Sequence, residues 1–113
     1  MNSIAVYCAS SIGVNPEYQA AARKLARWLV KNDLELVYGG GNVGLMGILA
    51  ETVLNNGGNV HGVITTQLFN REPPIAELKD LDIVPDMDTR QKKMKTLSDG
   101  CIALTGRPGT LKE

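Results

Sequence analysis

The chain has little material for disulfides or metal centres, since its 113 residues include two cysteines and one histidine. Cys8 and Cys101 each lie in an apolar, strand-like run, which predicts two buried thiols of a parallel sheet rather than a disulfide. His61 has apolar sequence neighbours and no cysteine or carboxylate cluster beside it, so we interpret it as a structural residue. The composition therefore predicts no metal site.

Net charge and long apolar runs are absent too. Twelve basic and twelve acidic residues cancel, which argues against a general binder of nucleic acid or anionic membranes but leaves room for a local basic pocket. No apolar stretch approaches the roughly 20 residues that span a bilayer, and no signal-peptide pattern opens the sequence. We expect a cytoplasmic chain without nucleic-acid or membrane partners.

What is present indicates one globular domain covering residues 1–113, in which 43% of the residues are hydrophobic. Five apolar runs are predicted strands, and the first of them lacks the polar alternation of half-exposed strands, as expected for a strand that is buried on both faces. These predicted strands are residues 4–8, 34–38, 60–64, 81–84 and 101–104. Helical segments alternate with them, which predicts an α/β fold with a doubly wound parallel sheet of about five strands.

Three segments have helical periodicity: residues 16–31, 45–54 and 90–97. Asn15 and Pro16 form a capping pair at the start of the first helix. Trp28 lies on the apolar stripe of that helix and is expected in the core or an interface. We expect residues 65–74 to be irregular and residues 111–113 to form the first turn of another helix.

A glycine-rich segment joins the strand 34–38 to the helix 45–54, and its sequence is GGGNVGLMG. Consecutive glycines permit positive φ and a close approach of a ligand to the main chain. The N–H groups of the following helical turn favour an anion, most simply a phosphate. The spacing matches neither the dinucleotide fingerprint nor the P-loop. The predicted binding residues in this segment are Gly39, Gly40, Gly41 and Gly44.

Two other segments follow strands and carry small or polar residues. Ser10 and Ser11 follow the first strand, where an ordinary turn is an equally good interpretation. The segment after the last strand holds Gly106, Gly109 and Thr110. Ligands of doubly wound sheets bind beyond the carboxyl ends of the strands, so all three segments are expected to converge on one crevice. The pattern predicts a small phosphorylated ligand, a nucleotide.

Arg90 opens a helix that also carries three lysines. Such a basic run is usually a solvated face, and the alternative is that Arg90 turns into the crevice.

Together these motifs resemble the LOG ("lonely guy") family of cytokinin riboside 5′-monophosphate phosphoribohydrolases, whose members are often labelled possible lysine decarboxylases. The matching segments are residues 6–11, 38–47, 60–64, 87–90 and 109–113. The resemblance implies a Rossmann-like homodimer that needs no cofactor and hydrolyses the N-glycosidic bond of a nucleoside 5′-monophosphate, releasing base and ribose 5-phosphate. Nothing in the sequence marks a Schiff-base lysine for decarboxylation.

The same resemblance implies roles for individual residues. Arg90 and Glu113 match the catalytic arginine and glutamate, and Met87 belongs to the substrate-binding motif. A carboxylate near the sugar can stabilise an oxocarbenium-like transition state. An arginine can hold that carboxylate or stabilise the leaving base. The segment of Gly106, Gly109 and Thr110, at a helix N-terminus, would bind the 5′-phosphate.

Departures from the family pattern lie near both motifs. Gln91 replaces a lysine, with Lys92 next to it, and Thr105 and Arg107 replace a proline and a glycine. Family members continue beyond the position of Glu113, where this chain stops, so we expect a fragment or a truncated product that lacks the C-terminal part of the fold. The alternatives to an enzyme are a nucleotide-binding module without turnover and a chain that does not fold by itself.

Overall fold

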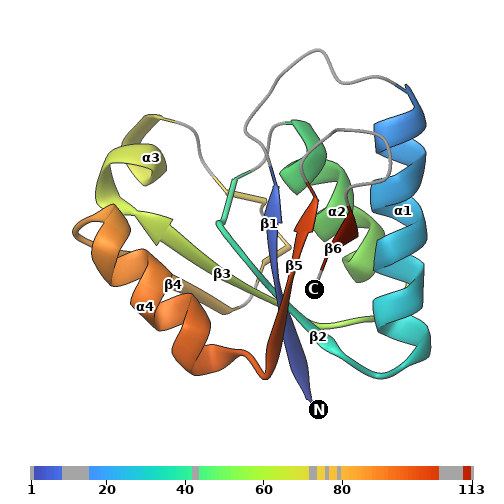
Figure 1. The fold of residues 1–113 in the computed structure, drawn as a ribbon. Coiled ribbons are helices and arrows are strands. Elements are labelled where there is room, and N and C mark those ends of the chain that lie inside the picture. The colour runs from blue at the N-terminus through green and yellow to red at the C-terminus, as the bar shows by residue number, and fades with distance from the viewer. Residues whose placement is uncertain are drawn as a thin grey trace.

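The computed structural model describes residues 2–8, 16–41, 44–71, 74–75, 77–78, 80–104 and 111–112 (Figure 1). The helices are α1 (Pro16–Lys31), α2 (Gly44–Asn55), α3 (Thr66–Arg71) and α4 (Met87–Leu97). The strands are β1 (Ser3–Cys8), β2 (Glu35–Tyr38), β3 (Val60–Thr65), β4 (Asp80–Val84), β5 (Gly100–Leu104) and β6 (Leu111–Lys112).

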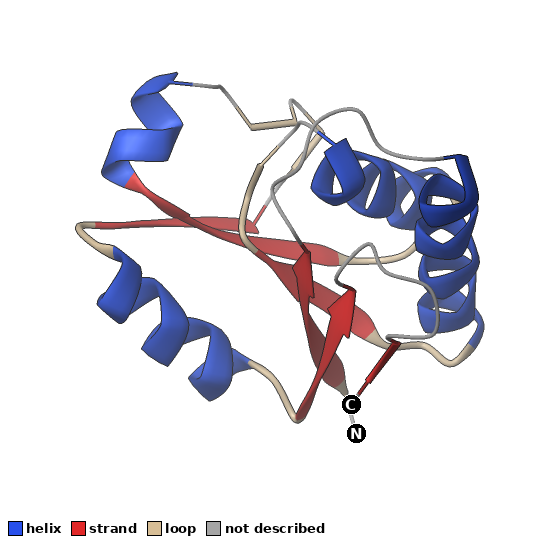
Figure 2. Cartoon of the chain, turned by 45° about the horizontal axis from the view of Figure 1, so that its top comes forward, coloured by secondary structure: helices blue, strands red, loops and turns tan. Residues whose placement is uncertain are grey.

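The strands form one sheet in the order β4-β3-β2-β1-β5-β6, in which β1 to β5 are parallel. Helices α1 and α2 cover one face and α4 covers the other, as Figures 1 and 2 show from two directions. This arrangement confirms the predicted doubly wound α/β fold. The strand order reverses at β1, so the switch point, where such folds bind ligands, lies between β1 and β5.

The central strands are buried on both faces, as the uninterrupted apolar run of β1 predicted for that strand. In β1, Ile4 and Val6 pack under α1 and α2, whereas Ala5 between them packs on the opposite face with Met94 of α4. The buried stripe of α1 consists of Ala22, Leu25, Ala26 and Leu29. Trp28 lies beside this stripe and is 47% exposed, so it is not in the core, and its alternative place in an interface stays a prediction.

Helix α3 contradicts the expectation that residues 65–74 are irregular. The hydroxyl oxygen of Thr65 accepts a hydrogen bond from the N–H of Leu68 at 3.2 Å, as a helix cap does. The Thr66 hydroxyl donates to the carbonyl of Val84 at 3.3 Å and ties the helix to the end of β4. A helix this short depends on such tertiary contacts, which sequence periodicity does not report.

Two other predictions near the C-terminal end are wrong. Leu111 and Lys112 form an antiparallel strand against Leu104 and Ala103 of β5, not the first turn of a helix. Pairing with the open edge of β5 satisfies their backbone groups, and three residues carry no periodicity that could reveal it. Cys101 is a free and exposed cysteine, not a buried one.

The first strand is fastened to the turn before β5 by Asp99. Its Oδ2 accepts hydrogen bonds from the backbone N–H groups of Asn2 at 2.7 Å and Ser3 at 3.1 Å. In return the N–H of Asp99 donates to the carbonyl of Ser3 at 2.9 Å, and the Ser3 hydroxyl donates to the carbonyl of Leu97 at 2.7 Å. The two backbone hydrogen bonds lower the pKa of Asp99 below its usual 3.8.

We expect Asp99→Asn to lower the Tm at pH 7, since asparagine keeps an acceptor oxygen but loses the charge. A pKa that is lower in the folded state stabilises the fold above about pH 3.8, and this stabilisation disappears as the pH falls through the folded value. The Tm difference between the two proteins should therefore shrink from pH 5 to pH 2 (roughly the range of the titration). Thermal unfolding followed by circular dichroism would test this, and equal Tm values at pH 7 would contradict it.

None of the helices in the described ranges is both long and apolar enough to cross a membrane.

Candidate functional site

A cavity of about 640 Å³ lies at the carboxyl ends of the strands. Its walls come from the ends of β1 and β3, from α3 and from the first turns of α4, with one residue of α2. The residues that line it are Val6, Tyr7, Met46, Thr65, Gln67, Leu68, Arg71, Pro85, Asp86, Met87, Arg90 and Gln91. This is the edge of the sheet at which the sequence predicts a ligand.

Arg90 is held at the wall of this cavity by the backbone of β3. Its Nε donates a hydrogen bond to the carbonyl oxygen of Val63 at 3.0 Å, and its Nη1 lies 3.5 Å from Sδ of Met87. Asp86 starts α4 by accepting a hydrogen bond from the N–H of Thr89 at 2.7 Å, so the helix begins three residues earlier than predicted. Of the two alternatives for Arg90, the structure therefore supports the one that turns it toward the crevice.

Gly39 leaves the space that the Arg90 guanidinium fills. A Cβ atom at position 39 would overlap Nη2 of Arg90 and would lie 2.8 Å from its Cζ. The φ angle of Gly39 is not positive, so the residue is glycine for room and not for backbone conformation. The strand that ends at Tyr38 and the helix that begins at Met87 thus meet through one glycine and one arginine.

The other glycines of the glycine-rich segment differ from Gly39 in backbone conformation or surroundings. Gly40 has φ +80°, and a Cβ there would lie 2.8 Å from Cβ of Ile64 on β3. Gly44 opens α2 with φ +67°. Gly41 is buried between them. Two of the four glycines therefore need positive φ, as predicted, and direct binding of phosphate by any of the four stays a prediction.

The cavity carries positive charge that the described residues do not neutralise completely. In the ranges that the structure describes, no carboxylate lies within ion-pair distance of the Arg90 guanidinium. Burial lowers the pKa of Arg90, and nearby Tyr7 opposes that shift, yet a guanidinium stays charged at neutral pH. Arg71 is a second cation in the wall, and the carboxylate of Asp86 is engaged by its helix cap. A half-buried guanidinium that has no carboxylate partner among the described residues favours an anionic ligand.

Some lining residues were not predicted as site residues, among them Tyr7 and Arg71. Burial, followed by the charge of Cys101, raises the pKa of Tyr7, so its phenol stays protonated and can donate a hydrogen bond. The position of Tyr7 near the end of the first predicted strand was the sequence signal that could have pointed to it as a site residue. Arg71 had none, because the helix that positions it was not predicted.

Gln91 stands where the family pattern has a lysine. Gln91 lines the cavity. Lys92 points elsewhere, because its Nζ pairs with Asp88 at 3.0 Å and its side chain is 77% exposed. Lys92 therefore does not stand in for the lysine that the family has one position earlier.

The remaining predicted site residues lie outside the described residues. They are Ser10, Ser11, Gly106, Gly109, Thr110 and Glu113. By their position in the chain, residues 9–15 follow β1 and residues 105–110 follow β5. These are the two strands of the switch point.

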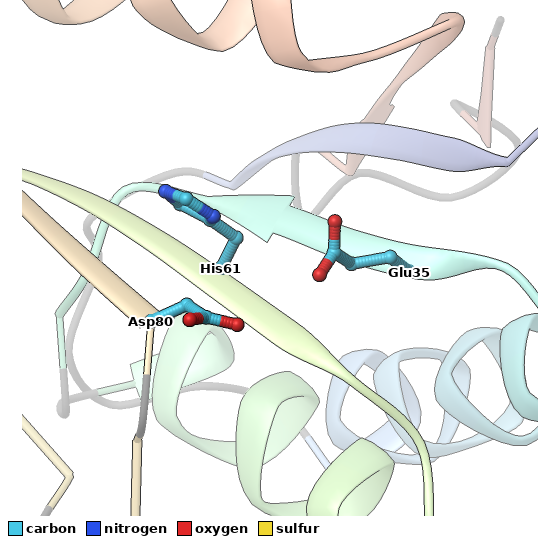
Figure 3. A group of neighbouring side chains, drawn as sticks. All are labelled: Glu35, His61 and Asp80. Atoms are coloured by element: carbon cyan, nitrogen blue, oxygen red, sulfur yellow. The ribbon is translucent and has the colours of Figure 1, made fainter.

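His61 lies away from the cavity and contradicts the expectation that no carboxylate is near it. Its Nε2 is 2.7 Å from Oδ2 of Asp82 on β4, a residue 21 positions later in sequence. Glu35 and Asp80 also approach it, and one potential ligand atom from each of the three side chains lies within 4.8 Å of the others (Figure 3).

The fold and this cavity define a Rossmann-like α/β protein with a cationic crevice at the switch-point edge of its sheet. Residues 46–113 match the model of the family described as "possible lysine decarboxylase". The chain belongs to this family, which includes the LOG proteins.

Its sequence relatives carry a more specific description. The chain is 44% identical over 110 residues to the cytokinin riboside 5′-monophosphate phosphoribohydrolase LOG7 of Arabidopsis thaliana, covering 97% of this chain and 51% of the relative. It is likewise 44% identical to the probable cytokinin riboside 5′-monophosphate phosphoribohydrolase LOGL6 of Oryza sativa subsp. japonica, covering 97% of this chain and 44% of that protein. The chain thus spans about half the length of the curated relatives that it matches.

Solved structures support the fold. The Moco carrier protein of Chlamydomonas reinhardtii aligns with a TM-score of 0.77 and 17% sequence identity, over 96% of this chain and 65% of that one. At this identity the likeness concerns the fold alone.

Proposed function

We propose that this chain is a single Rossmann-like nucleotide-binding domain, residues 1–113, of a nucleoside 5′-monophosphate phosphoribohydrolase. The observation that carries the proposal is the guanidinium of Arg90, fixed over Gly39 in the cavity without a carboxylate partner among the described residues. Relatives named for this reaction support it. The substrate is a cytokinin riboside monophosphate or a nucleotide of the AMP type.

The reaction breaks the C1′–N bond of the nucleotide, and the electron pair leaves with the base. Water adds to C1′ of the ribose, one of its protons ends on the base, and the products are free base and ribose 5-phosphate. Positive charge develops on the sugar and negative charge on the base in the transition state. A preorganised cation and a carboxylate are the groups that stabilise such a charge pair.

In this proposal Arg90 orients the carboxylate of Glu113 or stabilises the leaving base, and Glu113 stabilises the cationic sugar. The 5′-phosphate binds at Gly106, Gly109 and Thr110. The surrounding contacts come from Ser10, Ser11, Gly39, Gly40, Gly41, Gly44 and Met87. The protonated phenol of Tyr7 and the cation of Arg71 add donors that suit an anionic ligand.

The proposal extends to a cytoplasmic homodimer. The homodimer is what the resemblance to the LOG family implies, and large hydrophobic side chains on the surface are compatible with it. They are Trp28, Phe69, Ile83 and Met87, between 37% and 53% exposed. The free, exposed thiol of Cys101 fits a reducing compartment.

Incubation with AMP or a cytokinin riboside monophosphate tests this function. We expect release of free base together with equimolar ribose 5-phosphate, resolved by chromatography, and loss of release in Glu113→Gln. We also expect the nucleotide to raise the Tm, by an amount that grows with its concentration.

The two readouts separate the alternatives. A nucleotide-dependent Tm without base release would replace the enzyme by a binding module. A cooperatively folded sample that shows neither effect at millimolar nucleotide would overturn nucleotide recognition altogether.

A further inference from the structure

A second group of chemistry-bearing side chains lies at the opposite edge of the sheet from the cavity. Glu35 is the first residue of β2, His61 the second of β3 and Asp80 the first of β4. His61 pairs with Asp80 across β3 and β4 and with Val37 across β2 and β3, and Glu35 precedes Val37 by two residues. Alternate residues of a strand share a face, so all three side chains leave the same face of the sheet.

These three side chains converge in space. One nitrogen of His61 and one carboxylate oxygen each from Glu35 and Asp80 lie within 4.8 Å of one another. Figure 3 shows the side chains of Glu35, His61 and Asp80 arranged around a common space on neighbouring strands. Glu35 and His61 are half-buried and Asp80 is exposed, so the group is open to ions from solvent.

The orientation of His61 is set from outside this trio. Its Nε2 lies 2.7 Å from Oδ2 of Asp82, and Nζ of Lys93 on α4 lies 3.8 Å from the same oxygen. With Nε2 engaged by a carboxylate, Nδ1 is the nitrogen left to bind another group. Histidines that ligate metals commonly donate their other N–H to a carboxylate in this manner, which fixes both tautomer and ring orientation.

The charges around His61 also favour a bound cation. Glu35, Asp80 and Asp82 contribute three carboxylates around His61, and Lys93 is the cation that pairs with one of them. The local balance is therefore two negative charges when the imidazole is neutral. One divalent cation would neutralise them.

We propose that Glu35, His61 and Asp80 form a binding site for a first-row divalent cation, with Asp82 as the residue that positions the histidine. One imidazole nitrogen and two carboxylate oxygens suit Zn²⁺ among the biological divalent ions, and they leave at least one position for water. Because the three atoms lie up to 4.8 Å apart, side-chain rotations must bring them closer to bind one metal. The site joins the amino ends of β2, β3 and β4, so it stabilises the sheet and stands apart from the proposed reaction.

Zn²⁺ titration tests this proposal, best done in a Cys101→Ser background, because the exposed thiol would compete for the metal. We expect a saturable, one-to-one calorimetric isotherm and a Tm that rises with Zn²⁺ and falls back with a chelator. His61 is the sole histidine, so its ¹⁵N resonances report the site directly. Its Nδ1 resonance should shift on saturation, while Nε2 keeps its proton.

Matched variants complete the design. Glu35→Gln and Asp80→Asn should each abolish one-to-one binding, and Asp82→Asn should weaken it about 10- to 100-fold, as loss of such a positioning carboxylate does. Asp88→Asn, an exposed acid on α4 that pairs with Lys92, should bind Zn²⁺ like the parent. An unmoved Nδ1 resonance at saturating Zn²⁺, or binding that survives both ligand variants, would overturn the proposal. The Nδ1 resonance is measured in the parent protein alone, so this part of the test does not depend on the folding of the ligand variants.

Discussion

Replacing Arg90 with methionine should lower the rate of base release by about 10²- to 10³-fold, the usual effect of removing one preorganised donor from a reaction that develops charge. Arg90→Met should also abolish the rise in Tm caused by AMP. The fold should survive, because the lost hydrogen bond to Val63 is offset by removal of a half-buried charge. We expect the free energy of unfolding to change by less than about 1.5 kcal/mol.

Steady-state kinetics, AMP thermal shifts and urea unfolding measure these three quantities. Lys92→Met is the matched control, since it removes a cation of the same helix that is paired with Asp88 and lies outside the cavity. Equal losses in the two variants, or unfolding of Arg90→Met, would assign Arg90 a role in the fold instead.

The largest expected loss of stability comes from Gly40→Ala. Alanine at φ +80° costs about 1–2 kcal/mol, and its Cβ would lie 2.8 Å from Cβ of Ile64, a branched atom on a central strand that cannot swing away. Overpacking of this kind costs roughly a further 1–3 kcal/mol. We expect a total destabilisation of about 2–5 kcal/mol in urea unfolding.

Gly57→Ala provides an internal control for the backbone contribution. Gly57 has φ +81° at the end of α2, and a Cβ there would have nothing within 4 Å. Gly57 and Gly58 close this helix end by donating to the carbonyls of Leu54 at 3.1 Å and Val53 at 2.9 Å. Gly57→Ala should therefore cost only the φ contribution, and the difference from Gly40→Ala measures the contact with Ile64. Equal losses would show that this contact adjusts without cost.

Some features of the site followed from the sequence and others did not. The glycine segment after β2 and the arginine at the start of α4 could be singled out because glycine and arginine have distinctive chemistry. The meeting of Gly39 with Arg90 could not, because these residues are 51 positions apart and meet only when α4 packs beside β2 and β3. The structure therefore adds a steric requirement at Gly39 that the sequence could not reveal, and the predicted ligand contact of Gly39 stays a prediction.

The interpretation of His61 missed neighbours that the sequence does not reveal. Its sequence neighbours are apolar, so it was interpreted as a structural residue without carboxylates nearby. The parallel pairing of β3 with β4 brings Asp80 and Asp82 beside it, and pairing with β2 adds Glu35. Strand register is a tertiary property, and one residue of shift would send these acids to the other face of the sheet.

By itself the sequence determined the α/β class, the order of the main elements and the burial of the central strands, because hydrophobic periodicity and glycine placement are local properties. Only the tertiary structure decided which strands are neighbours, that β6 pairs with β5, and which side chains share the cavity and the Glu35–His61–Asp80 group. These outcomes depend on contacts between segments far apart in the chain. Such contacts form where packing and register bring the segments together, and no local pattern encodes their distances.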